Sequence, residues 1–431
     1  MRLLSFRFLT SDAQKAKPIS TQIYDLVKQV LPLTFADDDM QYRNDVLHTI
    51  HLFIKRIRAT SYNARKELGN AQSRVANHEN VLQSILHNAR KFTEWLVAYC
   101  RDCLTPGRTF YTTSMALDLL YILSTEEFFT DVDLGRPPST TWGLHLKLFS
   151  KALVRLLIDR LADPYEGVAR VALSLLSMMK DKKLIPLPEL HSKGLELCNS
   201  VRTDRSQGGA RALILCAKFQ KESERKITWN NIAQSVNRDI EVGTLESLAL
   251  KTPLQGRLVA LRYSPSFLEN ADLRCMDYEY DRGAFLLVED ICKLLWERAG
   301  PILTRDSPEG NVHVFGQPAL FTHLTHENFI DHLHKNGPLE HDDETQEILS
   351  SSWRSLKEAT ALLAHAIGCP STTIDDFTNV GKMLMEWLCK IRHRGAFSAI
   401  MPSFEQIISL CCVDQRRRFH TLPKEWLKVS R

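Results

Sequence analysis

Two short strings of cationic and aromatic residues carry side chains that are suited to binding an anionic ligand. The first string is SWRSLKE at positions 352–358, and the second is RHRGAF at positions 392–397. An arginine side chain presents a rigid fork of donors that matches phosphates and carboxylates, whereas lysine places a compact charge on a flexible stem. Because both strings fall in a region with helical periodicity, we expect a binding surface that is built on packed helices.

The candidate contact residues are the cationic side chains of these two strings, the histidine of the second string and a basic run farther along the chain. We expect these residues to bind RNA or a protein partner. Lys357 stands at the border of an apolar stripe, where a ligand can reach it. The full set is Arg354, Lys357, Arg392, His393, Arg394, Arg416, Arg417 and Arg418.

Each string also has a structural explanation. Arg354 and Glu358 are four residues apart and can pair along a helix, which contributes only ~0.2–0.5 kcal/mol. Residues 392–394 fall in the predicted last turn of a helix, where cations meet the negative end of the helix dipole. Gly395 would then take a left-handed conformation and terminate that helix. The sequence leaves open whether these cations cap a helix, bind a ligand or do both.

Three predicted helices position the two strings. The first begins at Asp343 and carries Trp353 on its buried apolar stripe, so we expect this indole in the core rather than as a stacking platform. The second begins at Asp375 or Asp376 and ends at residues 392–394. The third begins near Phe397 and contains a proline that should kink it or mark its true start.

Helical periodicity extends over the rest of the chain. Two neighbouring apolar stripes are separated by an Asp163-Pro164 turn, which is typical of a HEAT-type helix pair. A content of 44% hydrophobic and 25% charged residues indicates a folded chain. We therefore predict an all-α fold, an α-solenoid of HEAT- or armadillo-like repeats. The clearest stripe comprises Val46, Leu47, Ile50, Phe53, Ile54 and Ile57.

The sequence divides into three predicted segments. A helical-repeat array occupies 1–299, an insertion or loop rich in His, Pro and Gly occupies 300–342, and C-terminal helical repeats at 343–431 carry both strings. A shorter irregular insertion is expected at 126–141. The formal net charge of +4 is too small to indicate a nucleic-acid-binding protein, so any RNA surface must come from local clusters. Further clusters are Lys55, Arg56 and Arg58, and Arg65 with Lys66.

Signatures of an enzyme are missing from the sequence. It holds no phosphate-binding glycine loop and no nucleophile or zinc-protease motif, so we expect no cofactor and no small-molecule substrate. Two groups of residues could bind a metal ion, but their spacing matches no complete metal-binding motif. They are the Cys100–Cys103 pair and the histidines between 313 and 341. Ten scattered cysteines and the lack of an uninterrupted apolar run of about 18 residues predict a soluble cytoplasmic protein with reduced thiols and no membrane contact.

Three ordered motifs between 343 and 427 resemble a helical-repeat domain of the THADA-like proteins. They are SWRSLKE, RHRGAF and the closing LPKEWL at 422–427. Members of this family act as the non-catalytic partner of an FtsJ-like methyltransferase that modifies the ribose 2′-hydroxyl in the tRNA anticodon loop. The family usually has Cys where this chain has Ser352, and its members are several times longer. We therefore expect a fragment or a shortened member.

The resemblance implies the leading functional hypothesis. The chain would be a non-catalytic scaffold or regulatory subunit that supports 2′-O-methylation of the anticodon loop, expected at position 32, with an FtsJ-like tRNA methyltransferase and tRNA as partners. One alternative is a general protein-interaction scaffold without RNA binding. Another is a metal-dependent hydrolase that uses the His-rich insertion. RNA binding that weakens with salt separates the first hypothesis from the second.

Overall fold

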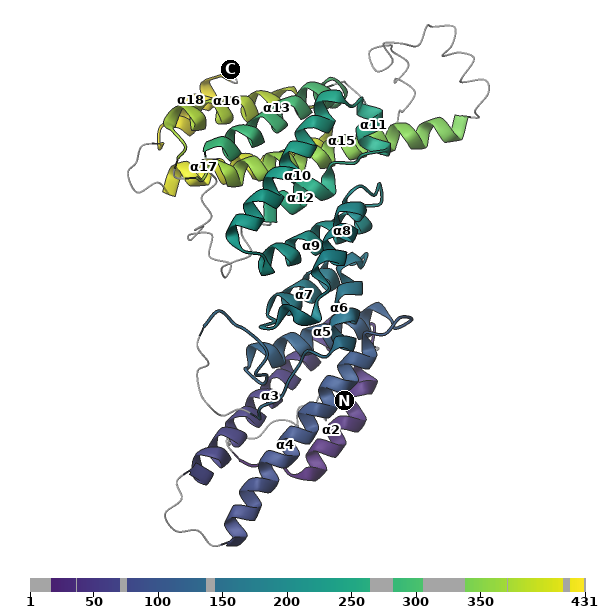
Figure 1. The fold of residues 1–431 in the computed structure, drawn as a ribbon, viewed down its shortest axis with the longest axis vertical. Helices are drawn as coiled ribbons and strands as arrows, with labels where there is room; N and C mark the ends of the chain where they lie inside the picture. The colour runs from purple at the N-terminus through teal and green to yellow at the C-terminus, as the bar shows by residue number, and fades with distance from the viewer. Residues whose placement is uncertain are drawn as a thin grey trace. The chain divides into compact units, whose positions relative to one another are not determined.

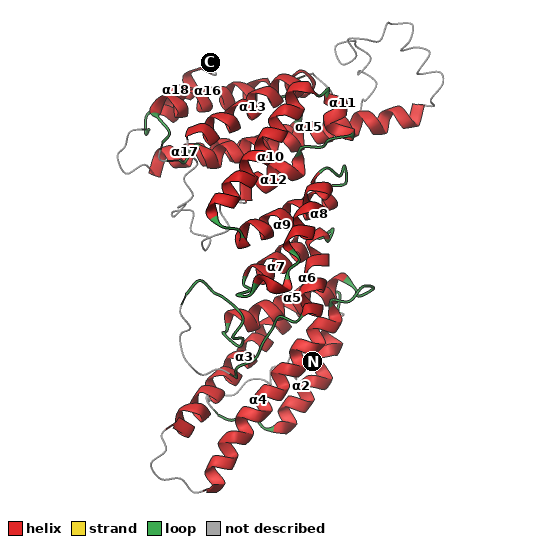
Figure 2. Cartoon of the chain, viewed as in Figure 1, coloured by secondary structure: helices red, strands yellow, loops and turns green. Residues whose placement is uncertain are grey.

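The computed structural model describes residues 17–35, 37–69, 76–136, 144–263, 282–304, 338–369, 371–413 and 419–429. Over these ranges the chain is helical and forms no strand, and its β-type pairing consists of two isolated bridges (Figure 2). This confirms the prediction of an all-α fold of helical repeats. The chain divides into two compact units, Met1–Leu187 and Pro188–Arg431, and each is described by itself.

Unit 1 is built from α-helices that pack against their neighbours in sequence. Helices α3 and α4 lie side by side, and α5 packs against α3, α4 and α7 (Figure 1). Hydroxyl side chains that precede α2, α5 and α6 accept a hydrogen bond from the first helical turn. The elements are α2 (Thr21–Thr34), α3 (Met40–Gly69), α4 (Ala76–Cys103), α5 (Phe110–Thr125), α6 (Lys151–Asp159), η1 (Arg160–Ala162), α7 (Glu166–Ser177) and η2 (Lys182–Leu184).

The predicted apolar stripe of α3 forms part of the core of unit 1. Val46, Ile50, Phe53 and Ile54 are all fully buried. The predicted helix pair around Asp163-Pro164 is also present, because η1 ends just before this turn and α7 begins just after it. The 3.6-residue period of apolar side chains was therefore a sound guide to these helices.

The predicted irregular insertion at 126–141 is tied to the core over its described part, 126–136. Both carboxylate oxygens of Asp131 accept hydrogen bonds from backbone amides, from Leu148 and from Phe149, each at 2.9 Å. Phe129 forms an isolated bridge with Leu146. These contacts hold residues 126–136 against residues 146–149 of unit 1.

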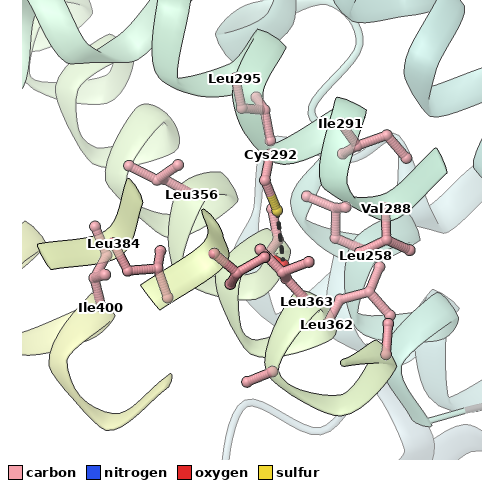
Figure 3. Packing of buried hydrophobic residues seen from close by; sticks show 14 of the residues in the cluster. Leu258, Val288, Ile291, Cys292, Leu295, Leu356, Leu362, Leu363, Leu384 and Ile400 are labelled. Carbon is pink, nitrogen blue, oxygen red and sulfur yellow. Dashed lines mark hydrogen bonds between the residues drawn. The ribbon is translucent and has the colours of Figure 1, made fainter. Parts of the chain in front are cut away.

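Unit 2 is organised around the long helix α15, which packs against α11, α12, α13 and α17. Figure 3 shows part of its core, where Val288, Cys292 and Leu363 meet, and where the Cys292 thiol donates to the Ala359 carbonyl at 3.2 Å. The helices are α8 (Leu187–Cys198), α9 (Thr203–Phe219), α10 (Glu222–Val242), α11 (Leu245–Leu250), α12 (Gln255–Tyr263), α13 (Arg282–Leu303), α15 (Pro338–Ala366), α16 (Ile374–Lys390), α17 (Arg394–Val413) and α18 (Leu422–Val429).

The three predicted C-terminal helices exist, but their ends differ from the prediction. Helix α15 begins at Pro338, ahead of Asp343. Helix α16 is capped by Thr373, whose hydroxyl accepts from the Asp376 amide while the Asp376 carboxylate accepts from the Thr373 amide. Helix α17 begins at Arg394 and continues through Pro402. The three-segment division at 300 and 343 stays a prediction, and the structure adds a division after Leu187.

The third motif, LPKEWL, closes the core of unit 2. It forms α18, and Trp426 is fully buried. A Cβ atom at Gly381 of α16 would lie 2.1 Å from the indole of Trp426, so only glycine permits this approach. This motif therefore has a packing role, distinct from the cationic surface that the other two motifs suggested.

By length and mean hydropathy, α17 is the helix among the described residues that could cross a membrane. Its sequence includes Ser398, Pro402, Ser403 and Glu405, so it is not an uninterrupted apolar run. It packs against α15 and α16, and its buried side chains belong to the core of unit 2. In this fold α17 is a core helix of a helical unit.

Cysteines are mostly buried, as predicted from their apolar surroundings. Among the described cysteines, Cys389 and Cys412 are exposed and the others are buried, and none of these thiols is joined in a disulfide. Burial raises the pKa of the Cys216 thiol to about 12, so this group stays neutral at physiological pH. Cys100 and Cys103 both lie in α4 with raised pKa values, again because of burial, and behave as small core residues.

Candidate functional site

The first two motifs, which are separated by α16 in sequence, meet at one pocket of about 580 Å³ in unit 2. Helices α12, α15 and α17 supply its walls. Its lining residues are Arg262, Trp353, Lys357, Ala361, His365, Gly395, Ser398, Ala399, Pro402, Ser403 and Gln406. A volume of this order is typical of pockets that bind small molecules or single chemical groups.

One wall of the pocket is a single face of α15. Trp353, Lys357, Ala361 and His365 recur at intervals of four residues, so they form one row along the helix. Trp353 is partly buried and packs against the core at its inner side. The prediction that Trp353 belongs to the core therefore holds for part of the indole, while the rest faces the pocket.

The opposite wall is the first half of α17, where small residues keep the space open. Gly395, Ser398, Ala399 and Ser403 contribute little side-chain volume, and Gln406 adds an amide farther along. Ser403 donates to the Thr360 hydroxyl at 3.3 Å, which ties this wall to α15. The two walls thus combine an aromatic and cationic face with a face of small polar residues.

A buried carboxylate links the pocket cations. Glu358 has a side chain that is 6% exposed, and its Oε2 lies 2.8 Å from Nη1 of Arg262. Its Oε1 lies 3.7 Å from Nζ of Lys357, whose side chain is 48% exposed. The charge of Arg262 is therefore balanced inside the protein, whereas Lys357 presents its ammonium group to solvent at the rim.

His365 lies in the pocket wall as a neutral imidazole at physiological pH. Burial lowers its pKa to about 4, and the positive charge of Arg262 acts in the same direction. The side-chain amide of Gln406 lies 3.4 Å from Nδ1 of His365. His365 and Gln406 are therefore polar but uncharged members of the pocket lining, beside the charge-balanced Arg262.

The predicted placement of residues 392–394 in the last turn of a helix is wrong. Helix α16 ends at Lys390, and Ile391 is already extended, with φ of −62° and ψ of 129°. The backbone amides of Arg392 and His393 both donate to the carbonyl of Leu303 in α13, at 2.9 and 3.3 Å. These hydrogen bonds join residues that are far apart in the sequence, so the local sequence does not reveal them. They fix the connection between α16 and α17 to α13.

His393 has a defined structural role at the start of α17. Its Nδ1 accepts a hydrogen bond from the Ala396 amide at 3.0 Å, so His393 caps the helix at its N-terminus. Gly395 is the second residue of α17 and lacks the left-handed conformation that we predicted. Its missing side chain serves another purpose, because a Cβ there would lie 2.9 Å from Cε1 of the His393 ring.

The corrected position of Arg394 removes its structural explanation. Arg394 is the first residue of α17, where the helix dipole is positive and repels a cation. Arg392 and Arg394 are both exposed. An exposed cation that opposes the dipole and directly precedes the pocket-lining Gly395 favours a ligand-binding role over a stabilising one.

Arg354 does not form the predicted pair with Glu358. Its Nη1 donates to the Thr203 hydroxyl of α9 at 3.0 Å, and its guanidinium lies 5.7 Å from the centre of the Trp353 ring. Glu358 is occupied by Arg262 and Lys357 instead. Arg354 therefore connects α15 to α9 and borders the aromatic wall, but it is not among the pocket-lining residues.

The basic clusters of unit 1 have different surroundings. Arg58 pairs with Glu126 and with Glu127, each at 3.0 Å, and Lys55 lies 3.8 Å from Glu126. Arg56 is buried and donates to the carbonyl of Lys17. The cluster of Lys55, Arg56 and Arg58 is therefore part of a structural network of ion pairs and hydrogen bonds.

Two groups of predicted residues lie outside the described residues. They are the basic run Arg416, Arg417 and Arg418, and the histidines of the insertion up to position 334. Within the described ranges, no group of three or more His, Cys, Asp or Glu side chains is arranged to hold a metal ion.

Sequence reasoning missed Arg262, His365, Ser398 and Gln406. The row of residues at intervals of four from Trp353 was a usable signal for His365, since it continues one face of α15. Arg262 had no such signal, because its partner Glu358 is brought close only by the packing of α12 on α15.

Comparison with known proteins identifies relatives over most of the chain. Residues 1–170 match the family model described as Trm732, TPR repeats, and residues 286–430 match the model described as THADA/TRM732, DUF2428. The tRNA (32-2′-O)-methyltransferase regulator trm732 of Schizosaccharomyces pombe is 27% identical over 458 aligned positions, which include 99% of this chain.

The chain spans 28% of the length of that relative. No solved structure matches the chain significantly. The second family model contains both strings that form the pocket, and the first contains most of unit 1. From these matches and the helical fold, we conclude that this chain belongs to the THADA/Trm732 family.

Proposed function

We propose that this chain is a non-catalytic regulatory subunit that supports 2′-O-methylation of tRNA, at position 32 of the anticodon loop, by a separate methyltransferase. The S. pombe relative is named as a regulator of such an enzyme. The chain would supply positioning, because holding a flexible RNA loop against an active site removes much of the entropic barrier to the reaction.

One observation carries this proposal: two separate motifs converge on a single pocket whose rim is cationic. Lys357 of α15 lines the pocket and is exposed, and the exposed Arg394 directly precedes the pocket-lining Gly395 in α17. Neither position has a helix-dipole benefit to explain it. Arg392 stands beside them on a connection that is fixed to Leu303. Exposed cations held on rigid helices are suited to binding phosphates in a fixed geometry.

Several finer features belong to the same proposal. The methyltransferase partner would be FtsJ-like, and the complex would act in the cytoplasm on tRNA that the chain contacts directly. The repeats would be of the HEAT or armadillo type, for which the helix pair around Asp163-Pro164 is the supporting observation. The proposed RNA contacts are Lys357, Arg392 and Arg394.

Reconstitution with purified components tests the proposal. The chain alone should transfer no methyl group from S-adenosylmethionine to tRNA, and adding it to the methyltransferase should raise ribose methylation at position 32. tRNA affinity of the complex should fall with salt, by about 0.7–0.9 in log–log slope for each phosphate contact. Methylation by the chain alone, or an enzyme that methylates equally well without the chain, would contradict the proposed role.

A further inference from the structure

We propose that the pocket between α15 and α17 receives one unpaired nucleotide of an RNA, with the base against Trp353 and a phosphate beside Lys357, on the side where Arg394 precedes the pocket-lining Gly395. This inference rests on the proposed function and specifies what its site binds. Its basis is the make-up of one pocket, in which neutral polar side chains and the charge-balanced Arg262 line the walls together with Lys357, whose side chain is 48% exposed.

The interior suits an uncharged planar group. The charge of Arg262 is balanced by Glu358 at 2.8 Å, and His365 is neutral because burial and the charge of Arg262 lower its pKa to about 4. Serine hydroxyls and the Gln406 amide supply neutral donors and acceptors. A base can use such groups along its edges, as proteins do when they read bases in unpaired RNA.

The walls suit a flat ring. The Trp353 indole forms part of one wall, and the facing wall begins with Gly395, Ser398 and Ala399, whose small side chains leave space beside the indole. Stacking between a base and an aromatic side chain is tolerant of base identity, so the pocket need not select one base. The guanidinium of Arg354, 5.7 Å from the Trp353 ring centre, extends the same surface.

An acidic peptide is less suited to this pocket. A carboxylate that entered the pocket would lie beside Arg262, whose charge is already matched by the buried Glu358, and would gain little to replace its lost hydration. The solvent-accessible cations are Lys357, whose side chain is 48% exposed, and the exposed Arg394, which directly precedes the pocket-lining Gly395. Neutral polar groups in the pocket and accessible cations beside them match a base joined to its phosphate.

The test compares unpaired with paired RNA on the complete chain, alone and together with the methyltransferase. One probe is a hairpin whose loop contains 2-aminopurine, and the other is a fully paired duplex with the same number of phosphates. Ser398→Leu fills the pocket from an exposed position, and Trp353→Leu removes the aromatic ring but keeps an apolar side chain. Phe397→Leu is the matched control, because Phe397 is exposed beside Ser398 but does not line the pocket.

We expect both pocket variants to weaken hairpin binding about tenfold, which is in the range for the loss of one base stack, and to leave duplex binding unchanged. Fluorescence of 2-aminopurine should be quenched by wild type and by the Phe397 variant but not by the pocket variants. If the Ser398→Leu variant unfolds at the same temperature as the wild type, its effect on RNA binding is local to the pocket.

Three results would overturn the nucleotide pocket. Unchanged hairpin affinity in both variants would do so while leaving the regulatory role in place, since that role is measured by methylation. Equal losses for hairpin and duplex would assign the pocket to the phosphate backbone. Loss of methyltransferase association with RNA affinity intact would assign the pocket to a protein partner.

Discussion

Basic residues stand at helix ends in both units, but the ends are opposite. In unit 1, Lys66 lies in the last turn of α3 and Arg65 directly precedes it, where the helix dipole favours a cation. In unit 2, Arg394 is the first residue of α17, where the dipole opposes one. A cation that helps its own helix needs no ligand to explain it, whereas a cation that works against its helix points to binding.

The acidic residues that contact these basic side chains also differ between the two units. In unit 1, Glu126 and Glu127 bind Arg58 directly and neutralise the cluster that includes Lys55. In unit 2, Glu358 is buried and faces Arg262, so it leaves the ammonium group of Lys357 at the surface. The same residue types therefore build a structural network in one unit and an accessible rim in the other.

The largest expected effect is on stability and comes from the buried acid of unit 2. Glu358→Ala should destabilise unit 2 by about 3 kcal/mol, because it leaves Arg262 largely buried without its counter-charge. Urea unfolding followed by circular dichroism measures this loss. The control is Glu425→Ala at an exposed position of α18, which should change stability by less than about 0.5 kcal/mol. If Glu358→Ala lowers the free energy of unfolding by less than about 1 kcal/mol, the ion pair between Arg262 and Glu358 behaves like a solvent-exposed pair.

The second prediction concerns how the stability of unit 2 depends on pH. The folded pKa of His365, about 4, is below the unfolded value near 6.5, so its contribution is complete above pH 6.5 and is lost as pH falls toward 4. We expect unit 2 to lose about 2 kcal/mol between pH 7.0 and 5.0 and His365→Gln to lose much less. Unfolding midpoints at pH 7.0 and 5.0 measure the effect, and identical losses in wild type and variant would contradict it.

Unit 1 should respond at lower pH. Burial alone would raise the pKa of Glu126, but hydrogen bonds with His51 and Arg58 lower it below its ordinary value of 4.5. A carboxylate with a lowered folded pKa stabilises the protein above its unfolded pKa, and that contribution is lost as pH falls further. Glu126→Gln should therefore alter the acid limb below about pH 4.5 and leave the range from 5 to 7 unchanged.

The smallest expected effects on stability have opposite signs at the two helix ends. Arg394→Glu should stabilise α17 by about 0.3–1 kcal/mol, because a carboxylate suits the positive end of the dipole. Lys66→Glu should destabilise α3 by a similar amount. Thermal unfolding of the two variants at low ionic strength measures both shifts, and a destabilising Arg394→Glu would show that Arg394 supports the fold.

The sequence predicted the helices well and their connections poorly. The stripe from Val46 to Ile57 identified α3 because burial of one helix face leaves a periodic signal in the chain. The prediction that Arg394 lies at the end of a helix was wrong. Hydrogen bonds from Arg392 and His393 to Leu303, about ninety residues earlier in the sequence, decide where α16 ends. Glycine at 395 suggested a helix end, whereas it makes room for the His393 ring that caps the next helix.

The candidate site was predictable in part. Both strings were recognised as binding elements, and Lys357 and Arg394 lie at the rim of one pocket or beside it. Their convergence could not be predicted, because it depends on how α15 and α17 pack with α16 between them in sequence. The roles of Arg262 and His365 depend on the same packing, since burial and the nearby charge of Arg262 keep His365 neutral.

Methylation by the reconstituted complex tests most directly whether the cations of unit 2 act in function and those of unit 1 do not. Arg394→Glu and Lys66→Glu make the same charge change at exposed positions of the two units. The account predicts that Arg394→Glu folds normally but lowers the stimulation of position-32 methylation about tenfold, the size expected for one charged contact, while Lys66→Glu stimulates like wild type. Equal stimulation by both variants, or a larger loss with Lys66→Glu, would contradict it.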